Sequence, residues 1–196
     1  RRDLLRTLLD VASALAARRR ERGSLWFDLP EAKVKLDAKT GLPVAIERSR
    51  GDAGVARAYN LVEEMMLLAN EVVAREFTQR RVPAIYRVHG PPDAERVEAF
   101  ATLARGFGFP LTEEAARDPK QLSQFLKRIE GTPHAAPIGY LLLRAMQQAT
   151  YSTENIGHFG LAADDYVHFT SPIRRYPDLV VHRIVRRIAR GERVAR

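Results

Sequence analysis

The sequence contains no cysteine, which excludes disulfides, thiolate metal sites and cysteine nucleophiles. It also contains no apolar run close to the roughly 18 residues that cross a bilayer. The opening RRDLLRTLLD is an interrupted amphipathic pattern, not a signal peptide. We therefore expect a soluble protein with no membrane segment, compatible with a reducing cytoplasm. With 196 residues, 45% of them hydrophobic and 29% charged, the chain is long enough to bury the core of one domain.

The motifs of several common enzyme classes are missing as well. There is no HExxH zinc motif, no phosphate-binding P-loop and no GxSxG nucleophile motif. Magnesium-dependent hydrolysis of a phosphodiester needs several carboxylates that converge on the ion. The adjacent acidic pairs have no companions at a suitable spacing; they are Glu63-Glu64, Glu113-Glu114 and Asp164-Asp165. The residues alone predict neither a metal site nor a self-evident catalytic centre in this chain.

Positive charge is concentrated at the two ends of the chain. The formal net charge is +8, and arginine outnumbers lysine 27 to 5. Residues 1–22 hold seven arginines against three acids, and residues 173–196 hold eight against two. Such clustering favours a polyanionic partner, with nucleic acid ahead of a membrane surface because neither end has the aromatic face of an interfacial anchor. A solvated basic surface is the alternative, and charge alone does not decide between them.

Hydrophobic periodicity predicts a helix-rich α/β (α+β) fold in a single domain, 1–196. We expect helices at residues 2–22, 52–79, 91–108, 118–131 and 136–151, and a last helix that begins near Ser171. Three short strands, at residues 24–30, 32–37 and 42–48, should form a small β-meander with a tight AKTG turn between the second and third. Residues 84–88 are predicted as another strand, and residues 152–176 as an ordered loop with a short strand.

The helix predicted at residues 52–79 is expected at the centre of the core, because its apolar residues cover about half of the circumference. At about 100° per residue, Glu63 and Asn70 fall close together at the border of the apolar face, whereas Glu64 points further round. We therefore expect Glu63 and Asn70 to be a half-buried pair. Such a pair would grip ribose hydroxyls or cap a neighbouring loop, and both uses stay open.

The stretch SPIRRYP places two arginines where a helix is expected to begin. Ser171 is a suitable N-cap and Pro172 a suitable first helical residue, which puts Arg174 and Arg175 in the first turn. Two positive charges at this end oppose the helix dipole. One explanation is a solvated pair or a contact with Asp178. The other is an anion, because guanidinium groups, nearby hydroxyls and free backbone amides together form a seat for one phosphate.

Two other segments combine polar and aromatic side chains. In NIGHFG, Asn155, His158 and Phe159 stand beside two glycines that let a backbone approach closely. The ring of Phe159 would stack on a base or belong to the core, and His158 would serve a site or be merely hydrogen-bonded. In YRVHGPP, Arg87 and His89 follow a short strand, which by itself is a weak indication of a site.

Several blocks together resemble the C-terminal half of the RNB catalytic domain of the RNase II and RNase R exoribonucleases. These blocks are LVEEMMLLANEVVA, PAIYRVHGPP, LLLRAMQQATYSTENIGHFGLA and YVHFTSPIRRYPDLVVHR. The resemblance covers essentially the whole chain and does not separate the two subfamilies. It implies processive, sequence-independent release of nucleoside monophosphates from the 3′ end of single-stranded RNA, assisted by Mg²⁺. The full-length enzyme is expected to be cytoplasmic and monomeric.

The same resemblance implies roles for particular residues. Arg174 matches the arginine that contacts the scissile phosphate, and either Glu63 or Glu64 matches a glutamate that contacts RNA. Site-lining positions of the family pattern are Asn155, His158, Tyr166, His168, Ser171 and Tyr176. Asn70, Arg87, His89, Phe159 and Arg175 complete the candidate RNA-binding set.

The acidic metal motif of this family belongs to the first half of the domain and is absent here. Asp164-Asp165 falls at a variable point of the pattern and does not replace it. Because the chain starts at Arg1 inside a helical pattern, we expect a fragment of a longer chain. Because the metal motif is absent, we expect that this fragment does not hydrolyse RNA alone, although the longer protein should. The alternatives are a non-catalytic basic RNA-binding module and a structural, partner-binding domain without salt-dependent affinity for RNA.

Overall fold

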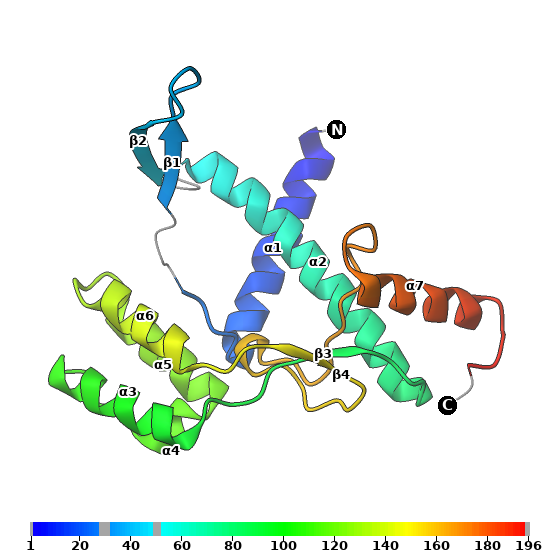
Figure 1. The fold of residues 1–196 in the computed structure, drawn as a ribbon. Helices are drawn as coiled ribbons and strands as arrows, with labels where there is room; N and C mark the ends of the chain where they lie inside the picture. Colours follow the sequence, from blue (N-terminus) through cyan, green and yellow to red (C-terminus); the bar gives the residue numbers. More distant parts are fainter. Residues whose placement is uncertain (1, 28–31, 49–51, 195–196) are drawn as a thin grey trace.

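The computed structural model describes residues 2–27, 32–48 and 52–194 (Figure 1). Two long helices cross near the centre, a β-hairpin projects from one end of them, and a group of shorter helices lies at the other. The elements in order are α1 (Arg2–Arg22), β1 (Ala32–Leu36), β2 (Pro43–Arg48), α2 (Ala53–Arg80), β3 (Tyr86–Val88), α3 (Ala94–Gly106), α4 (Glu113–Ala116), α5 (Pro119–Ile129), α6 (Ala135–Ala145), β4 (Thr150–Ser152), the 3-10 helix η1 (Phe159–Leu161) and α7 (Tyr176–Ala189). The predicted helix-rich fold class is confirmed. No described helix has the length and the apolar character needed to span a membrane.

Helix α1 ends at a glycine, as its sequence predicts. Gly23 has a φ of +110°, and its N–H and that of Ser24 bond to the carbonyls of Arg20 and Arg19 at 3.0 Å each. A Cβ atom at Gly23 would lie 2.7 Å from the backbone of Lys120, the second residue of α5. Glycine is therefore needed here both for the backbone conformation and for the close approach of α5.

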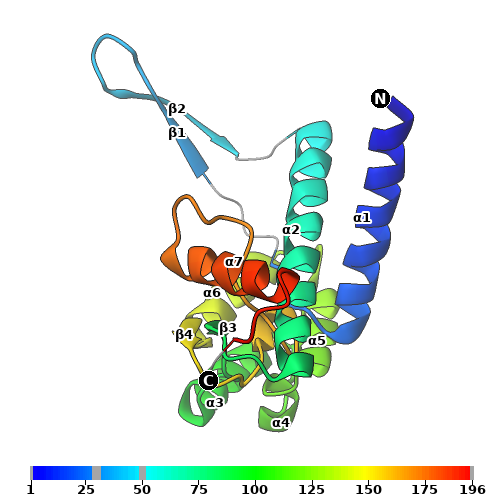
Figure 2. The same ribbon diagram turned by 90° about the vertical axis from the view of Figure 1, so that its right-hand side faces the viewer.

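Helix α2 runs alongside α1 (Figure 2) and buries only part of the apolar face that the sequence shows. Its carboxyl-terminal half is in the core, with Ala74 and Phe77 fully buried. In the first half, Val55, Tyr59 and Val62 are 46%, 54% and 55% exposed. The prediction that the whole helix is central to the core is therefore wrong for this half. The helical period shows that a face is apolar, but not which neighbour covers it.

The predicted three-stranded meander is wrong within the described residues. β1 and β2 form a two-stranded antiparallel hairpin in which Ala32 pairs with Arg48 and Val34 with Ile46. The AKTG turn between them is confirmed, and the Asp37 carboxylate holds it by accepting bonds from the N–H groups of Lys39 and Thr40 at 2.9 and 2.8 Å. Residues 24–27 are not a strand, and residues 28–30 of the predicted first strand lie outside the described residues.

Most of the buried apolar residues belong to one of two clusters that share no member. The first cluster lies among α3 to α6 and includes Leu122, Phe125, Ile138 and Leu142, with Leu25 and Phe159 added from other segments. The second joins the end of α2 to β3 and α7 and consists of Ala74, Phe77, Ala84, Tyr86, Val88, Val167 and Val181. The loop between η1 and α7 packs on this second cluster through Val167 and Phe169. It carries five of the fourteen predicted site residues, among them Arg174 and His168.

Candidate functional site

The two arginines of SPIRRYP have different environments. The guanidinium of Arg175 donates to both carboxylate oxygens of Asp178, at 2.8 and 2.7 Å, and Asp178 is fully buried. Arg174 is exposed, and its guanidinium makes no hydrogen bond or ion pair with any described residue. The contact with Asp178 thus accounts for Arg175 alone. Arg174 is the one of the pair left open to an outside anion.

The start of α7 corrects the sequence prediction. The helix begins at Tyr176 with Arg175 as its N-cap residue, and Pro177 occupies its first turn. Ser171 to Arg174 form a turn instead, because the N–H of Ser171 donates to the buried carboxylate of Asp178 at 2.8 Å. Burial opposes ionisation of Asp178, but the bonds from Arg175 and Ser171 outweigh it and lower its pKa. Arg174 therefore stands at the tip of an anchored turn rather than inside a helix.

The pKa of His168 is lowered beside this turn, by burial and by nearby positive charge. Burial and then the charge of Arg175 lower its pKa from 6.5 to about 4; Asp178 opposes this shift, and Arg87 and Arg174 add to it. Its Nδ1 lies 2.7 Å from the hydroxyl of Tyr151, and the guanidinium of Arg87 sits 4.8 Å from the centre of the Tyr151 ring. Arg87, Arg174 and Arg175 thus act on one imidazole, so a phosphate here would meet a field that favours its charge.

Behind His168, buried polar contacts connect the loop to α2. The amide of Asn70 donates to the Tyr166 hydroxyl at 3.0 Å and accepts from the N–H of Phe169 at 3.0 Å. Asn70 is 2% exposed, so the predicted half-buried pair with Glu63 is wrong. Burial raises the pKa of Tyr166, which stays a neutral phenol. Of the two uses left open for Asn70, the structure shows the one in which it holds a neighbouring loop.

The two adjacent glutamates of α2 are also distinguished. Glu64 is 5% exposed, and Arg19 of α1 donates to its two carboxylate oxygens at 2.5 and 3.3 Å. The helical wheel was therefore wrong to turn Glu64 away from the core, because it did not include a partner from α1. Glu63 is half-buried, as predicted, and makes no hydrogen bond or ion pair with the described residues. Only Glu63 is left with an unpaired carboxylate.

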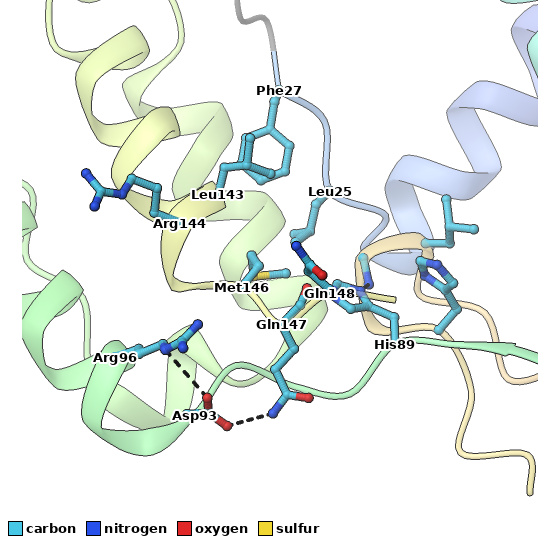
Figure 3. Close-up of a pocket in the computed structure, with 13 residues that line it drawn as sticks. Leu25, Phe27, His89, Asp93, Arg96, Leu143, Arg144, Met146, Gln147 and Gln148 are labelled. Carbon is cyan, nitrogen blue, oxygen red and sulfur yellow. Dashed lines mark hydrogen bonds and ion pairs between the residues drawn. The ribbon is translucent and has the colours of Figure 1, made fainter. Parts of the chain in front are cut away.

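His89 and His158 form a second group, next to a pocket of about 860 Å³ (Figure 3). Their ring centres are 5.0 Å apart. The Nδ1 of His89 accepts from the N–H of Gly160 at 3.0 Å, so its Nε2 carries the proton and donates to the Gln147 carbonyl at 2.8 Å. Burial lowers the pKa of His158 to about 3, with His89 adding to the effect. Both imidazoles are neutral. Both ring nitrogens of His89 make hydrogen bonds within the fold and are not free for a ligand.

Of the remaining predicted residues, Asn155 and Phe159 make contacts within the fold, whereas Tyr176 is exposed. Asn155 donates to Asp165 at 2.7 Å, and Asp165 also accepts from Thr78 at 2.6 Å, so this carboxylate is held by the fold. Phe159 is 9% exposed and belongs to the first apolar cluster, which places its ring in the core and not at an open surface. Tyr176 is 68% exposed at the start of α7. Its open ring lies two residues beyond Arg174.

Two residues near the turn, Tyr151 and Asp178, were not predicted as part of the site, whereas the hydroxyl of Thr170 was among those expected to help seat a phosphate. Tyr151 orients His168, Asp178 anchors the turn, and Thr170 has a buried hydroxyl with no hydrogen-bond partner in the described structure. A buried hydroxyl without a partner costs free energy unless a ligand or a water satisfies it. Thr170 and Asp178 flank the arginines in the sequence, which was the available signal; Tyr151 is brought in by the pairing of β4 with β3.

The described residues contain no group of three or more His, Asp or Glu side chains that could hold a metal ion. The turn and the loop before it carry the exposed guanidinium of Arg174, the neutral imidazole of His168 and the unpartnered hydroxyl of Thr170. Their chemistry is to bind a phosphate and to stabilise negative charge on its oxygens. The arrangement defines an anion-binding turn on a helix-rich scaffold, and it does not provide a nucleophile of its own.

Comparison with known proteins identifies the family. The RNB domain profile matches residues 2–191, and the chain belongs to the RNB domain family. It is 44% identical over 192 residues to Ribonuclease R 1 of Lactococcus lactis subsp. lactis, covering 97% of this chain and 23% of that protein. It is 41% identical over 190 residues to Ribonuclease R of Aquifex aeolicus, covering 97% of this chain and 26% of that protein. The chain thus spans about a quarter of the length of these curated relatives.

Solved structures show the same fold. The apo form of Mycoplasma genitalium RNase R and its complex with ribose methylated single-stranded RNA each match with a TM-score of 0.84 and 27% identity, over 93% of this chain and 28% of theirs. Yeast Ssd1, a pseudonuclease, matches with a TM-score of 0.69 at 23% identity, over 98% of this chain and 24% of that chain, which shows the fold alone. The resemblance drawn from the sequence blocks is confirmed.

Proposed function

We propose that this chain is the phosphate-binding part of a magnesium-dependent 3′-to-5′ exoribonuclease that releases nucleoside monophosphates from single-stranded RNA. The single observation that carries the proposal is the open guanidinium of Arg174 beside a locked Arg175. The relatives named ribonuclease R, and the RNA in the Mycoplasma genitalium complexes, support the choice of RNA as the polyanion. We further propose that the full-length protein is monomeric and cytoplasmic.

In this proposal, Arg174 acts on the scissile phosphate. A guanidinium donates two parallel bonds to phosphate oxygens and gains strength as negative charge builds on them in the transition state. The anchored turn matters because a preorganised charge needs no rearrangement when the reaction occurs. Asp178 and Arg175 supply this rigidity, and Thr170 offers a hydroxyl that a phosphate oxygen would satisfy.

Glu63 is proposed as the glutamate that contacts the RNA near the site. Glu64 is occupied by Arg19 inside the fold, whereas the carboxylate of Glu63 is unpaired among the described residues and is half-buried. A carboxylate accepts hydrogen bonds from ribose hydroxyls, which distinguishes RNA from DNA. Arg87 and Tyr151 lie next to His168 and offer a cation and a ring to the same strand.

Magnesium remains a proposal for the longer protein. The described residues of this chain have no cluster that fits the ion, so we propose that carboxylates outside this chain hold it. We accordingly expect the 196-residue chain alone to bind RNA without cleaving it. The alternative function is a non-catalytic RNA-binding module. The fold of the Ssd1 pseudonuclease, which matches this chain, agrees with either function.

The test is a turnover measurement on the intact protein with 3′-labelled single-stranded RNA and Mg²⁺. Replacement of one transition-state charge contact typically slows turnover by a hundredfold or more, so Arg174→Ala should lower kcat by about that factor with a smaller loss of RNA affinity. Arg183→Ala, which removes an exposed arginine from α7, is the matched control. An equal loss of kcat in both variants, or normal turnover in Arg174→Ala, would contradict the assignment. Absence of turnover in the unmodified protein would favour the binding module.

A further inference from the structure

A second pocket, of about 820 Å³, opens between the end of α1, α5 and α6, on a different part of the fold from the Arg174 turn. This volume is in the range of small-molecule pockets. The only tryptophan of the sequence, Trp26, lines it and is 40% exposed. The remainder of its apolar wall includes Leu126, Ile129 and Ala136. An open indole beside an apolar hollow is a surface on which a planar ring can stack.

One cation lies against this indole, and two more line the same pocket. The guanidinium of Arg20 lies 5.4 Å from the centre of the Trp26 ring, and Lys120 and Lys127 line the same pocket. The two lysines are seven residues apart on α5, so they share one face of that helix. None of the three cations makes an ion pair with a described residue. Glu21 and Glu130 line the same pocket and leave its lining with one net positive charge.

The lining of the pocket also includes a polar side chain, Gln124, that can serve a ligand. Gln124 lies between the two lysines along α5 and makes no hydrogen bond with the described residues. A carboxamide donates and accepts at once, which matches the edge of a nucleobase. Ser123, by contrast, already donates to the Ser24 carbonyl at 3.3 Å. The pocket thus offers an indole for stacking, a carboxamide for hydrogen bonds to a base edge and cations for a phosphate. A nucleotide is a ligand that uses all three.

We propose that this pocket binds one nucleotide, with its base on Trp26 and its phosphate near Lys120 and Lys127. The proposal rests on the proposed function only for the source of that nucleotide, which we take to be a single-stranded RNA segment outside the site of Arg174. Free nucleoside monophosphate carries the same chemistry and is the other source. An aliphatic or acidic peptide fits less well, because it would leave the indole face without a planar partner.

The first experiment uses the tryptophan itself. Because Trp26 is the only indole in the 196-residue chain, its fluorescence reports directly on the pocket. We expect saturable quenching by oligoadenylate in metal-free buffer, and by AMP at higher concentration. The RNA affinity should fall with salt, with a slope of about −1.4 in log K against log salt if two phosphates are neutralised. Quenching by AMP but not by the oligomer would assign the pocket to free nucleotide. No saturable change with either ligand would overturn the proposal.

Variants separate stacking from charge and from the other site. Measured by anisotropy of labelled oligoadenylate, Trp26→Ala should weaken binding about tenfold, the loss expected for one base stack, whereas Trp26→Phe should retain most of it. Lys120→Ala with Lys127→Ala should reduce the salt slope. Lys39→Ala, in the turn of the distant β-hairpin (Figure 1), removes one charge and is the charge-matched control for Lys120→Ala and Lys127→Ala made singly. Equal effects of the pocket and hairpin lysines would refute the site.

Arg174→Ala makes the two proposals distinguishable. If it abolishes turnover of the intact protein and leaves quenching of Trp26 in the 196-residue chain unchanged, both proposals stand. Normal turnover in Arg174→Ala with intact quenching would remove the catalytic assignment alone. Loss of turnover in Arg174→Ala, with no effect of Trp26→Ala on oligoadenylate affinity, would remove the pocket alone. The circular dichroism of each variant, measured beside the parent, establishes that a lost signal is not lost folding.

Discussion

Replacing Arg175 should unfold the turn that replacing Arg174 leaves intact. Asp178 is fully buried, and its carboxylate accepts three hydrogen bonds. Two of them come from the side chain of Arg175, which is 22% exposed. Arg175→Ala leaves a buried carboxylate with one backbone N–H as its partner. Breaking one side of a buried ion pair costs about 3 to 5 kcal/mol, and the partial exposure of Arg175 favours the lower end because water can enter the vacated space.

A loss of about 3 kcal/mol corresponds to a fall in Tm of about 6 to 12 °C for a domain of this size. Arg174→Ala removes an exposed and unpaired side chain, so its effect on the free energy of unfolding should stay within about 0.5 kcal/mol. The assay is thermal and urea unfolding of the two variants beside the parent, followed by circular dichroism. The two arginines are adjacent, equal in charge and equal in size, so each is the control for the other.

The double variant Arg175→Ala with Asp178→Asn tests the cause of this loss. Asparagine at this position keeps an oxygen that accepts the N–H of Ser171 but carries no buried charge. We expect the double variant to be more stable than Arg175→Ala alone, with a coupling energy of about 1 kcal/mol or more in the cycle. An Arg175→Ala variant as stable as Arg174→Ala, or strict additivity in the cycle, would refute the account of the anchored turn.

Three further predictions concern pH, phosphate and the α1 to α2 contact. His158 and His168, with pKa values lowered to about 3 and about 4, are neutral in the fold, whereas the unfolded chain protonates near 6.5. The free energy of unfolding should therefore fall as pH drops from about 7 to 4, and His168→Gln should flatten part of that slope in urea titrations. Phosphate bound at Arg174 should raise the pKa of His168 toward 6.5 in NMR titrations, and no rise should occur in Arg174→Ala. Arg19→Ala, which strands the buried Glu64, should cost about 3 kcal/mol or more, whereas Arg22→Ala, whose side chain is 39% exposed, should cost less than about 1 kcal/mol in the same unfolding assay.

The sequence predicted most helices because their apolar residues repeat with the helical period. Their ends differ by up to three residues, except that the helix predicted at 136–151 ends at Ala145 and the last helix begins at Tyr176 and not near Ser171. The sequence prediction failed where burial or strand pairing depends on a residue far away in the chain. Glu64 is buried because Arg19, 45 residues earlier, pairs with it. α2 leaves an apolar face open because α1 covers a different side. The helical period of the sequence does not show which side of α2 packs against α1. The strand β4 was missed because three residues become a strand only through pairing with β3.

The site was predicted more by composition than by geometry. The double arginine was singled out from the sequence, but its helix was placed too early because the capping rules treated Ser171 as an isolated N-cap. In the structure, the carboxylate of Asp178 takes the N–H of Ser171 and holds Arg175 as well. The choice between the two arginines, and between the two glutamates, depends on which one has an internal partner. That information lies in tertiary contacts.

The separation of the apolar core into two clusters has a thermodynamic consequence. The pocket of Trp26 rests on the first cluster through Phe27 and Ile129, and the turn of Arg174 rests on the second through Phe169 and Val181. Units that pack separately open separately in hydrogen exchange. Substitutions in the two places should then contribute additively to RNA affinity. A strand held at both would dissociate in two steps, so releasing one contact would leave the RNA tethered by the other.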